Sequence, residues 1–198
     1  MSEVSICNIA LTELGAEPLV ALADETKTAR LCSLHYPIAR DDLLSNYRWN
    51  FGLRRKALVA LTEAPVFGFT RKFQMPADIL RLWDTDLEEC DWHVVDDELE
   101  TDAEAVSILY SAKVTDTAKF STGFRRSLEL SIAARIGFSI TRLPQTVGLM
   151  ESRFQDALAD ARTFESQENS PETMGPGSRS IITARFRGSS FPLGVFNP

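Results

Sequence analysis

The stretch KTARLCSLHYPIARDDLLSNYRWNFGLRRKAL, residues 27–58, decides the fold that the sequence predicts. Apolar side chains recur at helical spacing through its first two thirds and predict an amphipathic helix that ends near Tyr47. The side chains expected on or beside its buried side are Leu31, Cys32, Leu34, Tyr36, Ile38, Ala39 and Leu43. Pro37 lacks an amide donor and its ring meets the carbonyl four residues earlier. We therefore expect a kink near residues 33–36, or a new helix that begins at Pro37.

Composition is typical of a soluble globular protein of one large domain, or of a domain with an insertion. The chain has 198 residues, of which 44% are hydrophobic and 25% are charged, and this length can bury a substantial core. No apolar run approaches the ~18 residues of a spanning helix, and the start of the chain lacks a basic segment, so neither a membrane span nor a signal peptide is expected. Three widely spaced cysteines indicate a reducing compartment rather than a disulfide framework.

Charge is unevenly distributed along the chain. Residues 84–104 contain eleven acids and no Lys or Arg, whereas the other residues hold 21 basic and 28 − 11 = 17 acidic side chains, a balance of +4. We call residues 84–104 the acidic segment. Its charge argues against phosphate binding there, because nucleic-acid contacts need Lys and Arg.

Helices are predicted at both ends of the chain and strands between them. Residues 2–14 read as a helix capped by Ser2 and stopped at Gly15, and Asp24 is expected to cap the next one. Short strands are expected within 66–73 and 79–83, at 92–95 and 99–101 as hairpin arms, and at 106–110. Helical periodicity returns at 122–141. The last helix carries a contact seam of Val147, Met150, Phe154, Ala157, Ala161 and Phe164.

These segments predict an α+β fold with about four helices in an antiparallel-type bundle and one small, mainly antiparallel inserted sheet. The expected parts are 1–51 and 120–168 for the helical body, 52–119 for the insertion and 169–198 for an extended C-terminal arm. After Gln167 the composition changes, and residues 179–198 hold three arginines, many apolar side chains and no acid. Such an arm is expected to dock, either on its own body or on a neighbour.

Three groups of residues have the composition of a chemical site, and each also has a structural explanation. Two Cys-x-x-His units, Cys32/His35 and Cys90/His93, have the ligand types of a zinc site, but chance spacing explains them as well. Two acidic groups, Asp84/Asp86/Glu88 and Asp96/Asp97/Glu98, would suit a two-metal enzyme or, more simply, a solvated surface. The aromatic and basic side chains of Arg48, Trp49, Arg54 and Arg55 resemble the clusters that bind single-stranded nucleic acid. Carboxylates such as Asp41 and Asp42 would also pair with these arginines. Known catalytic and nucleotide motifs are lacking, so no enzyme activity, cofactor, metal ligand or catalytic residue is assigned.

The order of several motifs resembles a family of structural proteins. The first set is Tyr36-Pro37, Ala39-Arg40-Asp41, Leu44, Trp49-Asn50-Phe51, Arg55 and Leu58. The second is the stretch 69–82 with its Met75-Pro76-Ala77-Asp78 step, and the third spans 110–167 and includes Val114-Thr115-Asp116. Together they resemble the head-to-tail adaptors of short-tailed bacteriophages, the tail tubular protein A family.

The resemblance implies a non-enzymatic virion protein. Members of that family form a ring, expected to be a dodecamer, between the portal and the tail nozzle, with DNA passing through the lumen and no membrane partner. By that resemblance the chain would wait in the host cytoplasm and act in the virion, its arm meeting the portal through Arg185, Phe186, Arg187, Phe191 and Phe196. A separate hypothesis rests on the eleven acids: if the acidic segment lines the lumen, its charge would repel phosphate and let DNA slide past. The alternatives are a metal-dependent enzyme that uses residues 84–104, or a DNA-associated regulatory protein.

Overall fold

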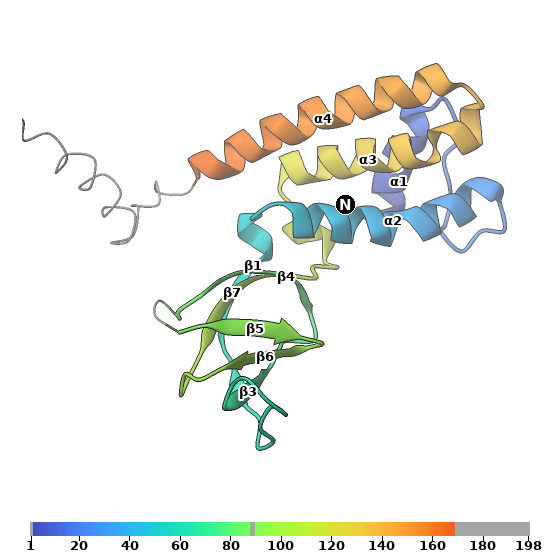
Figure 1. Cartoon of the computed structure of the whole chain (residues 1–198). Coiled ribbons are helices and arrows are strands. Elements are labelled where there is room, and N and C mark those ends of the chain that lie inside the picture. Colours follow the sequence, from blue (N-terminus) through green and yellow to red (C-terminus); the bar gives the residue numbers. More distant parts are fainter. Residues whose placement is uncertain (1, 88–89, 169–198) are drawn as a thin grey trace, which may run out of the picture. The chain divides into compact units, whose positions relative to one another are not determined.

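A computed structural model gives the fold of residues 2–87 and 90–168, and the structural statements below concern these residues. They form an α+β structure with four helices and two small antiparallel sheets (Figure 1). The helices are α1 (Glu3–Glu13), α2 (Lys27–Asn46), α3 (Thr122–Thr141) and α4 (Pro144–Gln167). The strands are β1 (Leu53–Ala57), β2 (Val59–Ala60), β3 (Arg71–Gln74), β4 (Ile79–Thr85), β5 (Trp92–Val95), β6 (Glu98–Thr101) and β7 (Ser107–Ala112). Single turns of 3-10 helix lie at Asn50–Gly52 and Thr117–Lys119.

Local signals set the ends of the first two helices. The Ser2 hydroxyl accepts a hydrogen bond from the Ser5 amide, and Gly15 has a φ of 68°, so the predicted cap and stop of α1 are confirmed. The prediction for α2 was wrong by two residues. Thr26 caps this helix, whereas the Asp24 carboxylate accepts from the Ala21 amide and closes the preceding turn.

Helix α2 runs through Pro37 without a break, so the expected restart at this residue was wrong. A proline inside a helix costs about 3 kcal/mol, but the same helix buries Cys32, Tyr36, Ala39 and Leu43 against the core. Burial of several such side chains outweighs that cost. The predicted buried side was also partly wrong, because Leu34 and Ile38 are 59% and 43% exposed.

Helix α3 is buried along most of its length and contacts both α1 and α2. At its start the Phe124 ring packs edge-on against the fully buried Trp49, with ring centroids 5.0 Å apart. Helix α4 adds Met150, Leu158 and Ala161 to the same core. Of the predicted α4 seam, Met150 and Ala161 are buried and Phe154 and Ala157 pack half-buried against the core, whereas Phe164 is 68% exposed.

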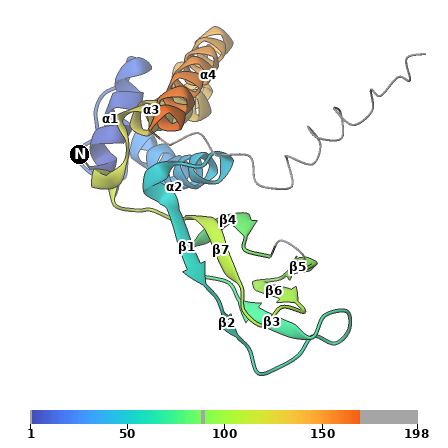
Figure 2. The ribbon, with the colours of Figure 1, turned by 90° about the vertical axis from the view of Figure 1, so that its left-hand side faces the viewer.

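The strands form two sheets rather than the single sheet that the sequence predicted. Their orders are β1-β7-β4 and β2-β3-β6-β5, and all pairs are antiparallel. Only Leu58 separates β1 from β2, so one bent segment of chain belongs to both sheets (Figure 2). The expected strand character of residues 66–69 was wrong, since Val66 and Phe67 are 96% and 85% exposed and pairing starts at Arg71.

Ion pairs join the first strands to the chain around them. Asp78 accepts from Arg54 at 2.5 Å and from the Tyr110 hydroxyl at 3.2 Å. Asp41 on α2 faces Arg40 at 2.7 Å and Lys113 at 3.2 Å. Arg54 therefore pairs with Asp78, and not with Asp41 or Asp42 as the sequence suggested.

Candidate functional site

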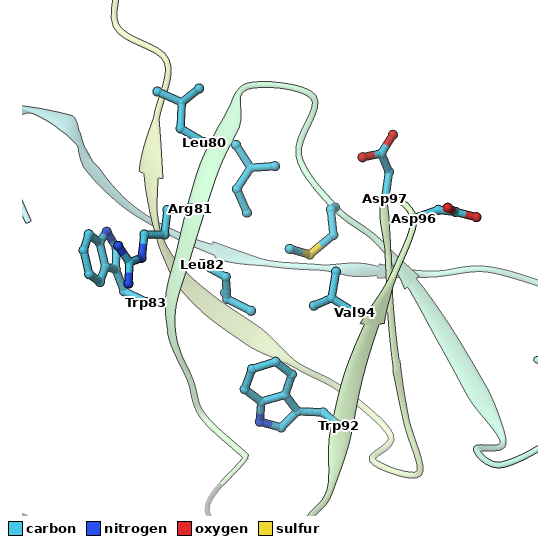
Figure 3. Close-up of a pocket in the computed structure, with 10 residues that line it drawn as sticks. Leu80, Arg81, Leu82, Trp83, Trp92, Val94, Asp96 and Asp97 are labelled. Carbon is cyan, nitrogen blue, oxygen red and sulfur yellow. The ribbon is translucent and has the colours of Figure 1, made fainter. Parts of the chain in front are cut away.

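The most distinctive surface feature is a groove between two strand edges. The bent β1–β2 segment links the two sheets. Across the linked sheets, β4 is therefore the edge strand at one end and β5 is the edge strand at the other. Strands β4 and β5 each pair on one side only within the described residues. Between them lies a cavity of about 360 Å³, which we call the β4–β5 groove (Figure 3). Its lining consists of Met75, Ile79, Leu80, Arg81, Leu82, Trp83, Trp92, Val94, Asp96 and Asp97.

Strand β4 presents its edge, rather than one face, to this groove. Five consecutive residues, 79–83, line the cavity, although successive side chains of a regular strand point to opposite faces. Register shifts lie between Ile79 and Arg81 and again between Leu82 and Asp84, so the strand is irregular along this edge. Bulges of this kind are common where sheet pairing ends.

Strand β5 is apolar and open to solvent along its whole length. Trp92, Val94 and Val95 are 37%, 45% and 48% exposed. In Figure 3 the side chains of Leu82, Trp92 and Val94 lie in the space between the strands. An exposed apolar edge strand is a ready template for another strand, and natural proteins cover or charge such edges.

Arg81 and Trp83 belong to the opposite side of β4 (Figure 3). The Trp83 indole donates to the Ser111 hydroxyl at 2.7 Å, and its ring lies under the guanidinium groups of Arg81 and Arg48, at 4.3 and 5.3 Å. Arg81 also donates to the Ser45 carbonyl at 3.3 Å, near the end of α2. These contacts pair Arg81 with the Trp83 ring and with the end of α2.

Acidic side chains gather at the hairpin turn that closes one end of the groove. Asp96 has a φ of 52°, a conformation that Asp tolerates better than most residues. The Asp97 carbonyl accepts from the Met75 amide at 3.0 Å and from the Gln74 side chain at 3.1 Å, which fixes the turn against β3. The carboxylates of Asp96 and Asp97 extend away from the apolar side chains in Figure 3.

The acidic segment is less unpaired than its sequence suggested. Lys72 pairs with Glu98 at 3.0 Å, and Arg71 meets Glu104 at 3.5 Å. The hydrogen bond from Lys72 to Glu98 raises the pKa of the lysine. Both partners come from β3, outside residues 84–104, so this pairing depends on the β3–β6 register and was not visible in the local sequence.

Of the residues considered for zinc, Cys32 is buried in the helical core, where its thiol interacts with Cys7, and Cys90 is exposed beside β5. The structure does not bring the two Cys-x-x-His units together. Across residues 2–87 and 90–168 no three His, Cys, Asp or Glu side chains are grouped as metal ligands.

The cluster considered for nucleic-acid binding is divided between core and surface. Trp49 is fully buried and its indole donates to the Leu43 carbonyl at 2.7 Å. The Arg48 guanidinium lies over the Trp83 ring, and Arg54 donates a hydrogen bond to Asp78. The five expected arm contacts, Arg185, Phe186, Arg187, Phe191 and Phe196, lie outside the described residues.

The β4–β5 groove was not predicted as a site from the sequence. The one local feature that points to it is the run Trp-His-Val-Val at 92–95, which is apolar at three of four positions. That this strand lies at an edge depends on which strands pair, and the local sequence does not specify pairing.

Comparison with known proteins adds no relative to this picture, since neither a scan against protein-family models nor a search of curated proteins finds a match. Within the described part of the chain, no helix is both long enough and apolar enough to cross a membrane.

Proposed function

We propose that this chain is a structural adaptor at the head-to-tail junction of a short-tailed bacteriophage. In this role, copies of the chain form a ring, expected to have twelve members, between the portal and the tail nozzle. The ring gives DNA a passage without reading its sequence. The chain acts in the virion after a soluble stage in the host cytoplasm, and it acts by contact rather than by catalysis.

The observation that carries the proposal is the place where the three motif stretches meet. Asp78 belongs to the second set and accepts from Tyr110, the first residue of the third stretch, and from Arg54, which lies inside the first stretch beside Arg55 but is not one of its matching residues. Burial, and next the negative charge of Asp78, raise the pKa of Tyr110 above its ordinary value. Separate motifs that converge on one junction support a shared fold more strongly than motifs scattered over a surface.

The arrangement of elements supports the same role. Two helices precede the strands and two follow them, as expected for a helical body interrupted by an inserted β-subdomain. Met150 and Ala161 are buried, so these members of the α4 seam serve the core. Ring contacts are better assigned to the exposed apolar side chains Leu34 and Ile38, which lie one helical turn apart on α2.

In a ring, each copy of an adaptor contacts its two neighbouring copies through two different surfaces. Such heterologous contacts close into a ring when the rotation between copies allows it. Leu34 and Ile38 supply one such surface, and the β-subdomain supplies strand edges for the tail side. The arm residues Arg185, Phe186, Arg187, Phe191 and Phe196 are the proposed portal contacts.

The proposal is tested with the portal protein of the same phage. The full chain is analysed by sedimentation velocity alone and after mixing with portal rings. Comigration of the chain with the portal at a fixed stoichiometry supports the proposal. Failure of the folded chain to bind portal rings at micromolar concentrations would contradict it.

A further inference from the structure

The β4–β5 groove lies between two sheet edges that have no further strand within the described part of the chain. One flank is β4, of seven residues, and the other is β5, of four. The side chains of Leu82, Trp92 and Val94 lie in the space between them (Figure 3). Strand addition at an exposed sheet edge is a common mode of peptide recognition, in which main-chain hydrogen bonds give affinity and alternate side chains give specificity. The groove therefore has the form of a docking site for an extended segment.

The side chains of β5 alternate between the groove and the other face of the strand. Trp92 and Val94 line the groove, whereas the His93 ring packs edge-on against Phe69, with ring centroids 5.4 Å apart. An added strand would follow the same alternation, because neighbouring strands of a sheet share their two faces. Every second residue of the occupant must then be apolar to cover Trp92 and Val94.

The charge of the groove selects for a basic occupant. Asp96 and Asp97 line the groove at the hairpin turn, and neither carboxylate forms an ion pair with another described residue. Lys56 lines an adjoining cavity together with Asp97, but no ion pair joins the two. The one base among the lining residues is Arg81, whose guanidinium lies 4.3 Å from the Trp83 ring, across β4 from Leu82 (Figure 3). Lys or Arg in the occupant would therefore pair with the two aspartates.

A second copy of this chain fits the edge less well than a basic segment does. If two β5 edges paired antiparallel, the Asp91 end of one copy would lie beside the Asp96 and Asp97 end of the other. Like charges opposite each other on paired strands are destabilising. The acids at both ends of β5 thus disfavour self-pairing and favour an unlike partner.

We propose that the β4–β5 groove binds an extended segment of another protein, in which apolar residues alternate with Lys or Arg. The apolar residues cover Trp92 and Val94, and the basic ones reach Asp96 and Asp97. This goes beyond the adaptor role proposed above and does not depend on it. Because its test contains no portal, failure of the peptide to bind would leave the ring proposal standing.

The test measures binding of three synthetic peptides to the full chain by isothermal titration calorimetry. The first, RVRFRVR, has the alternation and is as long as β4. The second, EVEFEVE, reverses its charge, and the third, RRVFVRR, keeps its composition and removes the alternation. RVRFRVR should bind at least about fivefold more tightly than EVEFEVE and at least about threefold more tightly than RRVFVRR.

The site of binding is located by photocrosslinking. The central Phe of RVRFRVR is replaced by p-benzoylphenylalanine, and peptide mapping identifies the crosslinked residues of the chain. Crosslinks should fall within 79–83 and 92–97. Crosslinks confined to the helices, equal affinity for RRVFVRR, or no binding at millimolar peptide would overturn the proposal.

Two neighbouring valines supply a matched pair of variants. Val94 lines the groove and Val95 does not, although they are 45% and 48% exposed. Val94→Lys should weaken binding of RVRFRVR at least about fivefold, because a lysine on an edge strand opposes strand addition. Val95→Lys should change it by less than about twofold. Equal effects of the two would contradict the groove as the site, and self-association of the wild-type chain that Val94→Lys abolishes would assign the groove to a second copy instead.

The ionic match is tested by removing two acids at a time. Asp96→Asn with Asp97→Asn should weaken binding of RVRFRVR about two- to fivefold. The turn should persist, because Asn also tolerates a positive φ and the Asp97 contacts use its carbonyl. Asp156→Asn with Asp160→Asn removes the same charge from exposed positions on α4 and should leave the affinity unchanged. With melting temperatures intact, equal affinities of the two double variants would refute the role of Asp96 and Asp97.

Discussion

Arg54 and Asp78, separated by 24 positions in the sequence, form a 2.5 Å hydrogen-bonded ion pair at the entrance to the strands. Asp78 also accepts from the Tyr110 hydroxyl, so one carboxylate joins β1, the start of β4 and β7. The Asp78 side chain is 35% exposed, so solvent screens the pair in part. The cluster therefore brings together three segments that are distant in the sequence.

Asp78→Ala should therefore lower the free energy of unfolding by about 1–3 kcal/mol, the range for hydrogen bonds to a charged group. Tyr110→Phe should cost about 1 kcal/mol, because it removes one hydroxyl donor only. Urea denaturation followed by circular dichroism measures both. The matched control is Asp84→Ala on the same strand, whose carboxylate accepts from the adjacent Thr85 amide, and its effect should stay within about 0.5 kcal/mol. Equal effects at Asp78 and Asp84 would argue against the junction.

Glu13 should make stability depend on pH in the acid range. Its carboxylate accepts two hydrogen bonds from Arg153, at 2.5 and 3.2 Å, and meets Arg126 at 2.9 Å, so it links α1 to α4 and α3. These partners, Arg153 first, lower the pKa of Glu13 in the folded state. The folded state then binds fewer protons than the unfolded state, so this stabilisation is present above the ordinary pKa of the carboxyl group and is lost as pH falls through the lowered value.

Glu13→Gln should accordingly destabilise the protein at pH 7, and this effect should shrink progressively below the ordinary carboxyl pKa and be lost as pH falls through the lowered value. Thermal melts between pH 3 and 7, with the wild type beside the variant, give the difference. Glu129 provides the opposite case, because burial raises its pKa. Its contribution becomes less favourable as pH rises through its ordinary value, so Glu129→Gln should gain relative stability toward neutral pH. A constant gap between wild type and Glu13→Gln at every pH would contradict the assignment.

Close packing of α3 on α4 depends on Gly123. A Cβ atom at this position would lie 2.7 Å from the Ala161 Cβ and 3.0 Å from its Cα, so Gly123→Ala must push the helices apart. The expected loss is about 1–3 kcal/mol. Gly148 in α4 has no neighbour within 4 Å of such a Cβ, so Gly148→Ala should instead stabilise by about 0.5–1 kcal/mol through helix propensity. Differential scanning calorimetry should place the two melting temperatures on opposite sides of wild type.

The proposed role of α2 in ring assembly can be tested without a large change in the stability of the fold. Leu34→Glu with Ile38→Glu changes two exposed side chains, so the melting temperature should move little, while portal-dependent assembly should be lost. Val66→Glu with Phe67→Glu changes an equally apolar exposed pair in the connection before β3 and should leave ring assembly intact. The readout is the stoichiometry of the portal complex. Assembly that survives the α2 change would move the ring contact elsewhere.

The sequence predicted features that local chemistry sets. The Ser2 cap, the Gly15 stop and the limits of α3 follow from neighbouring residues, and all are confirmed. The hairpin between β5 and β6 was also predicted from its own residues. The α+β class followed from the order of these segments.

Features set by distant partners were missed. Pro37 favours a helix break locally, and burial of Tyr36 and Ala39 against other helices reverses that preference. The division into two sheets depends on strand pairing, so neither the edge position of β5 nor the groove could be read from residues 92–95 alone. The partners of Glu98 and Glu104 come from β3 for the same reason.

The central claim is that this chain works as a ring between portal and tail. Cryo-electron microscopy of the phage particle that contains it tests this most directly. The account predicts a ring of this chain, with twelve copies, directly beneath the portal, and helices that match α1–α4. Density at that position that fits another protein, with this chain elsewhere or absent from the particle, would contradict the account.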